Sequence, residues 1–458
     1  MSCNELVAKL LLQYFMNLRN HKTRFFEIPI RYNTIQAHSK IELRKFPYPF
    51  KAGLAISSDI DGTTTLEEFI NIQSFLNTNE YTPLGKGLGL EIGNSFWMYS
   101  INPKNKFTYF KGITNKPSDS AAIIISLIKS GYLDTIHTYG DFNKKGGFTR
   151  KLAIEAIDTL KKNNCYVKIW INHGDKHNTQ NIGILQYCKG DDPGKIEYHT
   201  DQLLDYGIKF IWVSKLTHFI GQDRKLNFRE FVNWFLFRPF QRLHDIARAL
   251  VGHNTLWIIK NDLLQEISLD DGQKIWSFVR YGFWDKASSC DLINILNTKT
   301  LNVLKKNKGY MIVYTHLGKK TRSDICLCEK TQNALKYLAN EYKNGEIYVT
   351  TTSKLLTYNL TNRYLDWTKK YKDNFYVINI KGIKDPTSGY YIPPLSDLQG
   401  MTFYTPDPSK TKIFLREQEI KDLVINPPDY TDRLSISIPL TSLSFPKDLI
   451  RSRFSKKS

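Results

Sequence analysis

The chain has 458 residues and a formal net charge of +20, with 41% hydrophobic and 13% aromatic residues. This composition is globular and excludes an intrinsically disordered chain, and the length predicts a large catalytic domain with a smaller companion. The charge predicts attraction to anionic partners, but the lysines are scattered without a basic stripe or recognition fold, so nucleic acid is not an expected partner.

The first segment, residues 1–45, is predicted to be an amphipathic helix with a polar lead-in. It lacks the basic start and small-residue cleavage site of a signal peptide, and no stretch of the chain is long and apolar enough to span a bilayer. The six cysteines lack zinc-finger spacing and are expected to be reduced thiols. We therefore expect a cytoplasmic protein, with contact to a membrane surface left open.

Between residues 46 and 365, apolar runs alternate with helical patterns. The predicted strands lie at 54–61, 87–92, 133–138, 167–173, 208–214, 256–260, 310–316 and 346–352. The predicted helices lie at 64–77, 118–130, 149–163, 289–305 and 328–344. This alternation predicts an α/β fold, with parallel strands and helices forming a distorted β/α barrel that is the catalytic domain.

Two segments depart from this alternation. Residues 223–250 form a basic, aromatic helical insert that contains Arg238, Arg242 and Arg248. The insert is either an extra helix packed on the barrel or an interfacial helix that touches a membrane or a lipid-linked substrate. Residues 372–450 have short apolar runs separated by turns, which predicts a small all-β domain resembling a β-sandwich.

Several apolar runs end in an acid or a histidine. Asp59 and Asp61 follow the first run, and their spacing places both carboxylates on the same side of a strand. Three later runs lead to His137 and Asp141, to Asn172 and His173, and to His316. In a β/α barrel the carboxyl ends of the strands share one face, so these groups are expected to converge. Acid and imidazole groups that converge suit a divalent metal.

The residue types suggest separate roles. Asp61, His137 and Asp141 offer one imidazole and two oxygen ligands, which suits Zn2+ or another first-row divalent ion. Asp59 would accept the proton of the attacking water, and His316 would protonate the departing amine. His137 and Asp141 face each other only if the loop after the strand is helical.

The segment from Phe46 to Gly62 resembles the opening of the polysaccharide (NodB-type) deacetylase family, in which an apolar strand ends in two aspartates. The family's His-Ser/Thr-x-x-His motif is similar to the segment from His137 to Asp141, where aspartate replaces the second histidine. A late strand that ends in the family's acid is similar to the segment from Val313 to His316. The resemblance covers about residues 46–355.

The resemblance implies a metal-dependent hydrolase that removes an N-acetyl group from a glycan or sugar, which could be anionic or lipid-linked. It implies that Asp59 is the catalytic base and His316 the acid. Arg150 is the nearest candidate for the arginine of the family's Arg-x-Pro-Tyr motif. Arg150, Asn172 and His173 are the expected substrate-binding residues, and His173 could instead be a metal ligand in place of Asp141.

The same residues also suit other functions. The segment Asp59-Ile60-Asp61-Gly62-Thr63 also looks like the nucleophile motif of haloacid-dehalogenase-type phosphatases, with Asp59 attacking a phosphoryl group and Mg2+ bound. A glycosidase also uses two carboxylates, and a glycan-binding protein could keep the barrel without catalysis. Structurally, the two aspartates could cap the next helix, and Gly140-Asp141 is ordinary turn chemistry.

Overall fold

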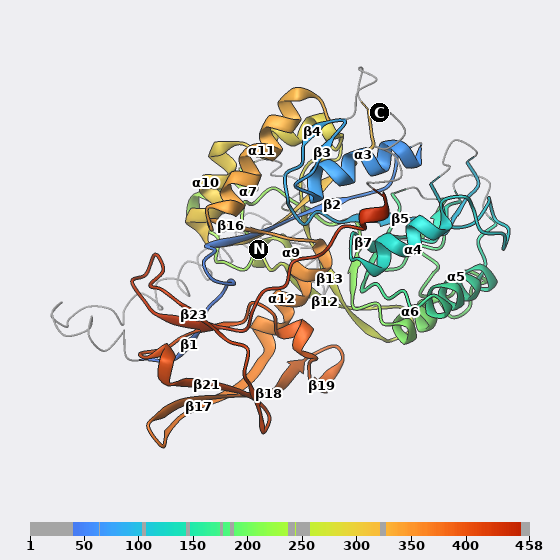
Figure 1. Cartoon of the computed structure of the whole chain (residues 1–458). Helices are drawn as coiled ribbons and strands as arrows, with labels where there is room; N and C mark the ends of the chain where they lie inside the picture. Colours follow the sequence, from blue (N-terminus) through green and yellow to red (C-terminus); the bar gives the residue numbers. More distant parts are fainter. Residues whose placement is uncertain are drawn as a thin grey trace, which may run out of the picture.

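The computed structural model describes a mixed α/β protein with several parallel strand pairings (Figure 1). The described residues are 40–63, 65–102, 107–142, 147–174, 177–183, 187–236, 243, 257–320 and 327–449. The predicted N-terminal helix and Arg238, Arg242 and Arg248 of the insert lie outside these residues. No helix within the described ranges has the length and hydrophobicity needed to cross a bilayer.

A five-stranded parallel sheet is built around the strand β2 (Ala52–Ser58). Its order is β11 (Leu216–Thr217), β14 (Arg280–Tyr281), β15 (Tyr310–Thr315), β2 and β16 (Ile347–Val349). The strand β2 is buried along its whole length, because Leu54 and Ile56 pack in one core cluster and Ala55 in another. Its unbroken apolar sequence is typical of a parallel strand covered on both faces.

A second, six-stranded sheet adjoins the first. Its order is β12 (Leu264–Ser268), β13 (Lys274–Phe278), β10 (Phe210–Trp212), β9 (Ile169–Ile171), β7 (Leu133–His137) and β5 (Asn94–Phe96), parallel except for the β12–β13 pair. The chain passes from β10 into β11 and from β13 into β14, so the two sheets share these chain segments. At the other end, Ile60 N–H donates to Ser95 Oγ at 2.8 Å and links the end of β2 to β5.

Helices lie outside these sheets (Figure 1). They are α3 (Leu66–Asn77), α4 (Ala121–Lys129), α5 (Arg150–Lys162), α6 (Thr200–Tyr206), α7 (Phe228–Leu236), α9 (Trp257–Lys260), α10 (Thr298–Asn307), α11 (Glu329–Lys343) and α12 (Thr352–Tyr364). In α5 the buried residues are Ala153, Ala156, Ile157 and Leu160, a spacing that forms one apolar face.

Most predicted helices are confirmed, and two predicted strands are wrong. The helix predicted at 289–305 is divided into the 3-10 helix η2 (Ser289–Asn294) and α10. Residues 257–260 form the helix α9 instead of a strand, since a short apolar run fits either structure. Residues 87–92 form no strand because Leu88 and Leu90 N–H groups donate to carbonyls at the end of α3; the strand β5 follows them.

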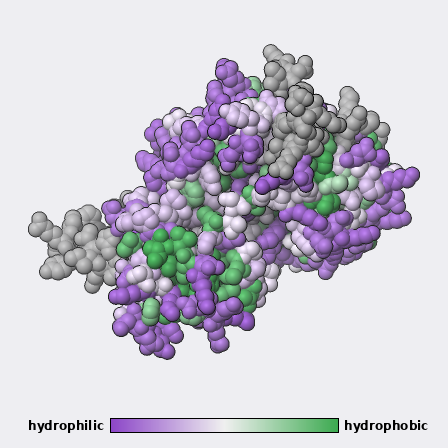
Figure 2. Space-filling view, viewed as in Figure 1, coloured by the Kyte–Doolittle hydropathy of each residue, from purple (hydrophilic) through white to green (hydrophobic). Residues whose placement is uncertain are grey.

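The C-terminal region is rich in β structure, as predicted, and forms a lobe at the lower left of Figure 1. One sheet contains β17 (Leu365–Lys372), β18 (Phe375–Asp385), β19 (Gly389–Tyr391), β21 (Thr411–Leu415) and β22 (Gln418–Ile420). The other contains β1 (Glu42–Leu43), β20 (Thr402–Tyr404), β24 (Ser435–Ser437) and β23 (Val424–Asn426). Apolar side chains gather on the surface of this lobe (Figure 2). Val424 and Ile425 of β23 are exposed large hydrophobic residues.

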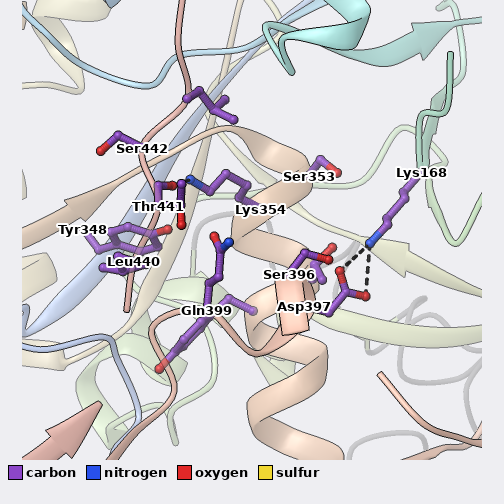
Figure 3. Close-up of a pocket in the computed structure, with 13 residues that line it drawn as sticks. Lys168, Tyr348, Ser353, Lys354, Ser396, Asp397, Gln399, Leu440, Thr441 and Ser442 are labelled. Atoms are coloured by element: carbon purple, nitrogen blue, oxygen red, sulfur yellow. Dashed lines mark hydrogen bonds and ion pairs between the residues drawn. The ribbon is translucent and has the colours of Figure 1, made fainter. Parts of the chain in front are cut away.

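Polar contacts join the C-terminal region to the strands and to α12. A cavity of about 300 Å³ lies at this junction, and Figure 3 shows Lys168 paired with Asp397 across it. The buried Glu91 accepts from Lys354 Nζ at 2.7 Å and from Leu443 N–H at 2.6 Å. These bonds tie the start of α12 and the C-terminal segment to one carboxylate.

Candidate metal centre

The end of β2 fixes the two aspartates predicted from the sequence. Asp59 N–H donates to Thr315 O at 2.9 Å, which continues the pairing of β2 with β15. The chain then turns at Gly62, which has a φ of +82°. A Cβ at Gly62 would lie 2.8 Å from Lys319 Cα, so the turn needs glycine for both its conformation and its space. This turn leaves Asp61 at the carboxyl end of the sheet.

Two histidines from the second sheet meet Asp61. His137 is the last residue of β7, and its Nε2 lies 2.8 Å from Asp61 Oδ2. His173 follows β9, and its Nε2 lies 2.8 Å from Asp61 Oδ1. Both Nε2–H groups donate to the carboxylate, and a divalent ion would bind the same nitrogen and oxygen atoms after these protons leave. Asp61, His137 and His173 form a group whose ligand atoms could hold one metal ion.

Neighbouring side chains fix the two imidazoles. Asn178 Nδ2 lies 2.6 Å from His173 Nδ1, and Asn181 Oδ1 accepts from His173 N–H at 3.0 Å. The Trp97 ring stacks on His137 with the ring centroids 5.9 Å apart and the planes 12° apart. The Asn178 amide and the Asn181 carbonyl thus orient His173, whereas Nδ1 of His137 has no hydrogen-bond partner among the described residues, and its ring is held by stacking on Trp97.

The electrostatics favour an ionised Asp61. Burial raises the pKa of Asp61, but His137 and His173 outweigh it through charge attraction and hydrogen bonds, so the pKa lies well below its usual range. Burial likewise lowers the pKa of His173, and Asp61 more than reverses this and raises the pKa to about 9. Asp61 therefore carries a negative charge that stabilises a positive charge beside it, and such a site suits a cation.

Asp59 has a different environment from Asp61. It is buried, and Arg280 Nη1 donates to both of its carboxylate oxygens at 2.9 and 3.0 Å. Arg280 is fully buried, and its guanidinium lies 4.0 Å from the centroid of the Trp212 ring. The ion pair with Arg280 fixes the Asp59 carboxylate beside Asp61.

His316 lies on the other side of Asp61. It follows β15, and its Nε2 is 3.8 Å from Asp61 Oδ2. Its Nδ1–H donates to Ala287 O at 2.9 Å, so Nε2 faces the carboxylate. Asp59, Asp61 and His316 form a second group that could hold a metal ion. We call Asp59, Asp61, His137, His173 and His316 the acid–histidine cluster.

Three predicted site residues have other contacts. Asp141 belongs to neither candidate metal group; it lies in β8 (Gly140–Asp141), which pairs with β6 (Tyr99–Ser100), and the loop after His137 is not helical. Arg150 donates to both carboxylate oxygens of Asp201. Asn172 is buried and bonds to Trp170 and Ile182. His173, which the sequence left open as an alternative to Asp141, is the residue that joins Asp61 and His137.

Sequence reasoning missed Arg280, Asn178 and Trp97. Arg280 follows the apolar run 275–279, so a cation after such a run was the signal that could have identified it. Asn178 lies in an irregular segment and carries no comparable signal. The arrangement as a whole offers a group that could hold a cation, a fixed carboxylate beside it and an imidazole opposite; hydrolysis is one reaction that such groups can support.

Comparison with known proteins adds no assignment to this geometry. No family model, curated protein or solved structure matches the chain.

Proposed function

We propose that the chain is a metal-dependent hydrolase that removes an N-acetyl group from a glycan or sugar. The main support for this proposal is that Nε2 of His137 and Nε2 of His173 each lie 2.8 Å from one of the two carboxylate oxygens of Asp61. Two imidazoles and one carboxylate suit Zn2+ or another first-row divalent ion. We also propose that the five-stranded and the six-stranded sheets form one distorted barrel, incompletely closed between β16 and β5.

The chain's own residues supply the proton transfers in this proposal. A divalent ion held by Asp61, His137 and His173 would lower the pKa of a water molecule and polarise the acyl carbonyl. Asp59, fixed by Arg280, takes the proton of the attacking water. His316 Nε2 faces the Asp61 carboxylate from the other side and gives a proton to the departing amine.

The proposal predicts that metal binding and proton transfer can be separated. Asp61→Ala, His137→Ala and His173→Ala each lose stoichiometric metal, whereas Asp141→Ala retains it. Asp59→Asn and His316→Ala retain metal but lose roughly a hundred-fold or more in turnover, as general acid–base contributions usually run. Metal analysis and acetate release from an N-acetylated oligosaccharide, with and without chelator, measure both effects. Full metal content in the first three variants contradicts the site.

A phosphatase that uses Asp59 as nucleophile is the rival function. It gives no role to His137, His173 and His316, which the structure brings together at Asp61. A covalent intermediate distinguishes the two functions: only the phosphatase forms an acid-labile phosphoryl adduct on Asp59, and it needs Mg2+. A beryllofluoride adduct on Asp59 in a crystal would replace our proposal with this one.

A further inference from the structure

An aromatic surface leads from the acid–histidine cluster to solvent. The Tyr314 ring lies 5.3 Å from the His316 ring, and the Trp284 ring lies 5.7 Å from that of Tyr314. Trp284 also lies 5.7 Å from the Trp212 ring, yet 56% of its surface is exposed. A tryptophan held by other rings but left open at the edge of a polar site offers a flat apolar face to a ligand.

The residue before Trp284 belongs to a separate cavity. The Phe283 ring stacks on His218 with the centroids 4.7 Å apart and the planes 14° apart. Both line a cavity of about 340 Å³, a volume within the range of small-ligand pockets. Its apolar lining comes from Phe219, Ile220, Trp234, Ile258, Phe283 and Val303. One loop therefore presents Trp284 toward the cluster and Phe283 to the cavity.

The chemistry of this cavity selects an apolar occupant. Among the described residues that line it, Glu230 is the one acid, and it forms a bidentate ion pair with Arg224 and a hydrogen bond with Asn227 N–H. The other polar residues in this described lining are His218, which stacks on Phe283, and Asn233. A sugar or a phosphate would find few hydrogen-bond donors there, whereas a hydrocarbon chain would bury apolar surface.

The helix α7 adds a second apolar feature beside the cavity. Its Trp234 is buried and lines the cavity, while Phe228 and Leu236 of the same helix are 63% and 65% exposed. A helix that exposes large apolar side chains next to an apolar cavity suits a substrate that is presented from a lipid surface.

We propose that the substrate is an amphiphile: its acylated sugar lies in the acid–histidine cluster against Trp284, and its hydrocarbon chain occupies the cavity behind Phe283. This inference rests on the proposed function, and it narrows the substrate class from glycans in general to sugars that carry an apolar chain. The cavity then gives binding energy remote from the reacting bond, which can be used to orient the sugar.

The test compares two ligands that differ in chain length alone. Methyl and octyl N-acetyl-β-D-glucosaminide are titrated by calorimetry into the wild-type protein, below the micelle concentration of the octyl compound. The octyl compound is expected to bind at least tenfold more tightly, because burial of two methylenes already gives about this factor. Equal affinities for the two compounds overturn the proposal.

A substitution in the cavity tests whether the octyl group binds there. Val303 lies on α10 and lines the cavity, so Val303→Phe fills part of it and is expected to reduce the ratio of the two affinities to about one. Ile154→Phe on the surface of α5 is the matched control and keeps the ratio. An unchanged ratio in a folded Val303→Phe protein overturns the proposal, and thermal unfolding checks the fold of both variants.

The design separates this inference from the proposed function. Acetate release from neither compound, together with a preference for the octyl chain that depends on Val303, would refute the deacetylase function and retain the chain site. Acetate release from both compounds with equal affinity and equal turnover would support the function and refute the amphiphile.

Discussion

The two aspartates at the end of β2 have different partners although one residue separates them. Asp61 faces the imidazoles of His137 and His173, whereas Asp59 is held by the guanidinium of Arg280. One carboxylate accepts from two histidines and the other is fixed by a permanent cation. Our proposal therefore assigns metal binding to Asp61 and proton transfer to Asp59.

The ion pair between Arg280 and Asp59 yields a prediction about stability. Arg280→Met leaves the Asp59 carboxylate buried without its cation, which is expected to lower the free energy of unfolding by roughly 3–5 kcal/mol. The double variant Arg280→Met with Asp59→Asn should recover part of this loss, because the unpaired charge is removed. Urea denaturation of the wild type, Arg280→Met and the double variant measures these free energies of unfolding. A double variant less stable than Arg280→Met would contradict the prediction.

The site residues that stand at the ends of strands could be predicted from the sequence. Asp59, Asp61, His137 and His316 each follow an apolar run, and the structure brings them together. The choice between Asp141 and His173 could not be made, because it depends on the loop after each strand. Pairing of β8 with β6 gives Asp141 an extended backbone, and Asn178 and Asn181 fix His173 at the cluster.

At the scale of elements, sequence reasoning succeeded where the apolar spacing is regular. The helices α3, α4, α5 and α11 agree with their predicted ranges because their apolar spacing is regular over several turns. The helix α12 and the strands β12 and β13 were not predicted. The four-residue helix α9 was taken for a strand, since so few residues cannot distinguish the two periodicities.

The junction between α5 and α6 contains a buried histidine that yields a prediction about pH. His199 precedes α6 and is enclosed by the rings of Tyr139, Phe148 and Trp170. Its Nε2–H donates to Gln180 O at 2.8 Å. Burial lowers the pKa of His199 to about 4, below the value of about 6.5 expected for an unfolded chain.

The sign of this effect follows from proton binding. Between pH 6.5 and pH 4 the unfolded chain binds a proton at His199 that the folded protein does not, so stability falls as the pH falls. The stabilisation that comes from the neutral, buried His199 is fully present above pH 6.5. Roughly 3 kcal/mol of it is lost by pH 4. Urea denaturation from pH 7.5 to pH 4 should show a steeper loss in the wild type than in His199→Leu. Parallel curves would contradict the prediction.

At the scale of the whole molecule, Glu91 connects three distant parts of the chain. Its carboxylate accepts from Thr350 Oγ1 and Lys354 Nζ at the start of α12, and from Leu443 N–H in the C-terminal segment. Glu91→Ala removes these bonds at a buried site and is expected to lower the free energy of unfolding by roughly 3–5 kcal/mol. The exposed Glu67→Ala is the control and should stay within about 0.5 kcal/mol of the wild type.

The central position of β2 has a consequence for how the protein is made. Its ladder partners are β15 and β16, and both are synthesised long after Ser58 leaves the ribosome. Until Tyr310 emerges from the ribosome, both edges of the apolar strand β2 lack their partners. Exposed, unpaired strand edges of this kind promote aggregation. Fragments that end before β15 should therefore accumulate in inclusion bodies, and production of the full chain should benefit from slow expression at low temperature and from chaperones that hold unfolded strands.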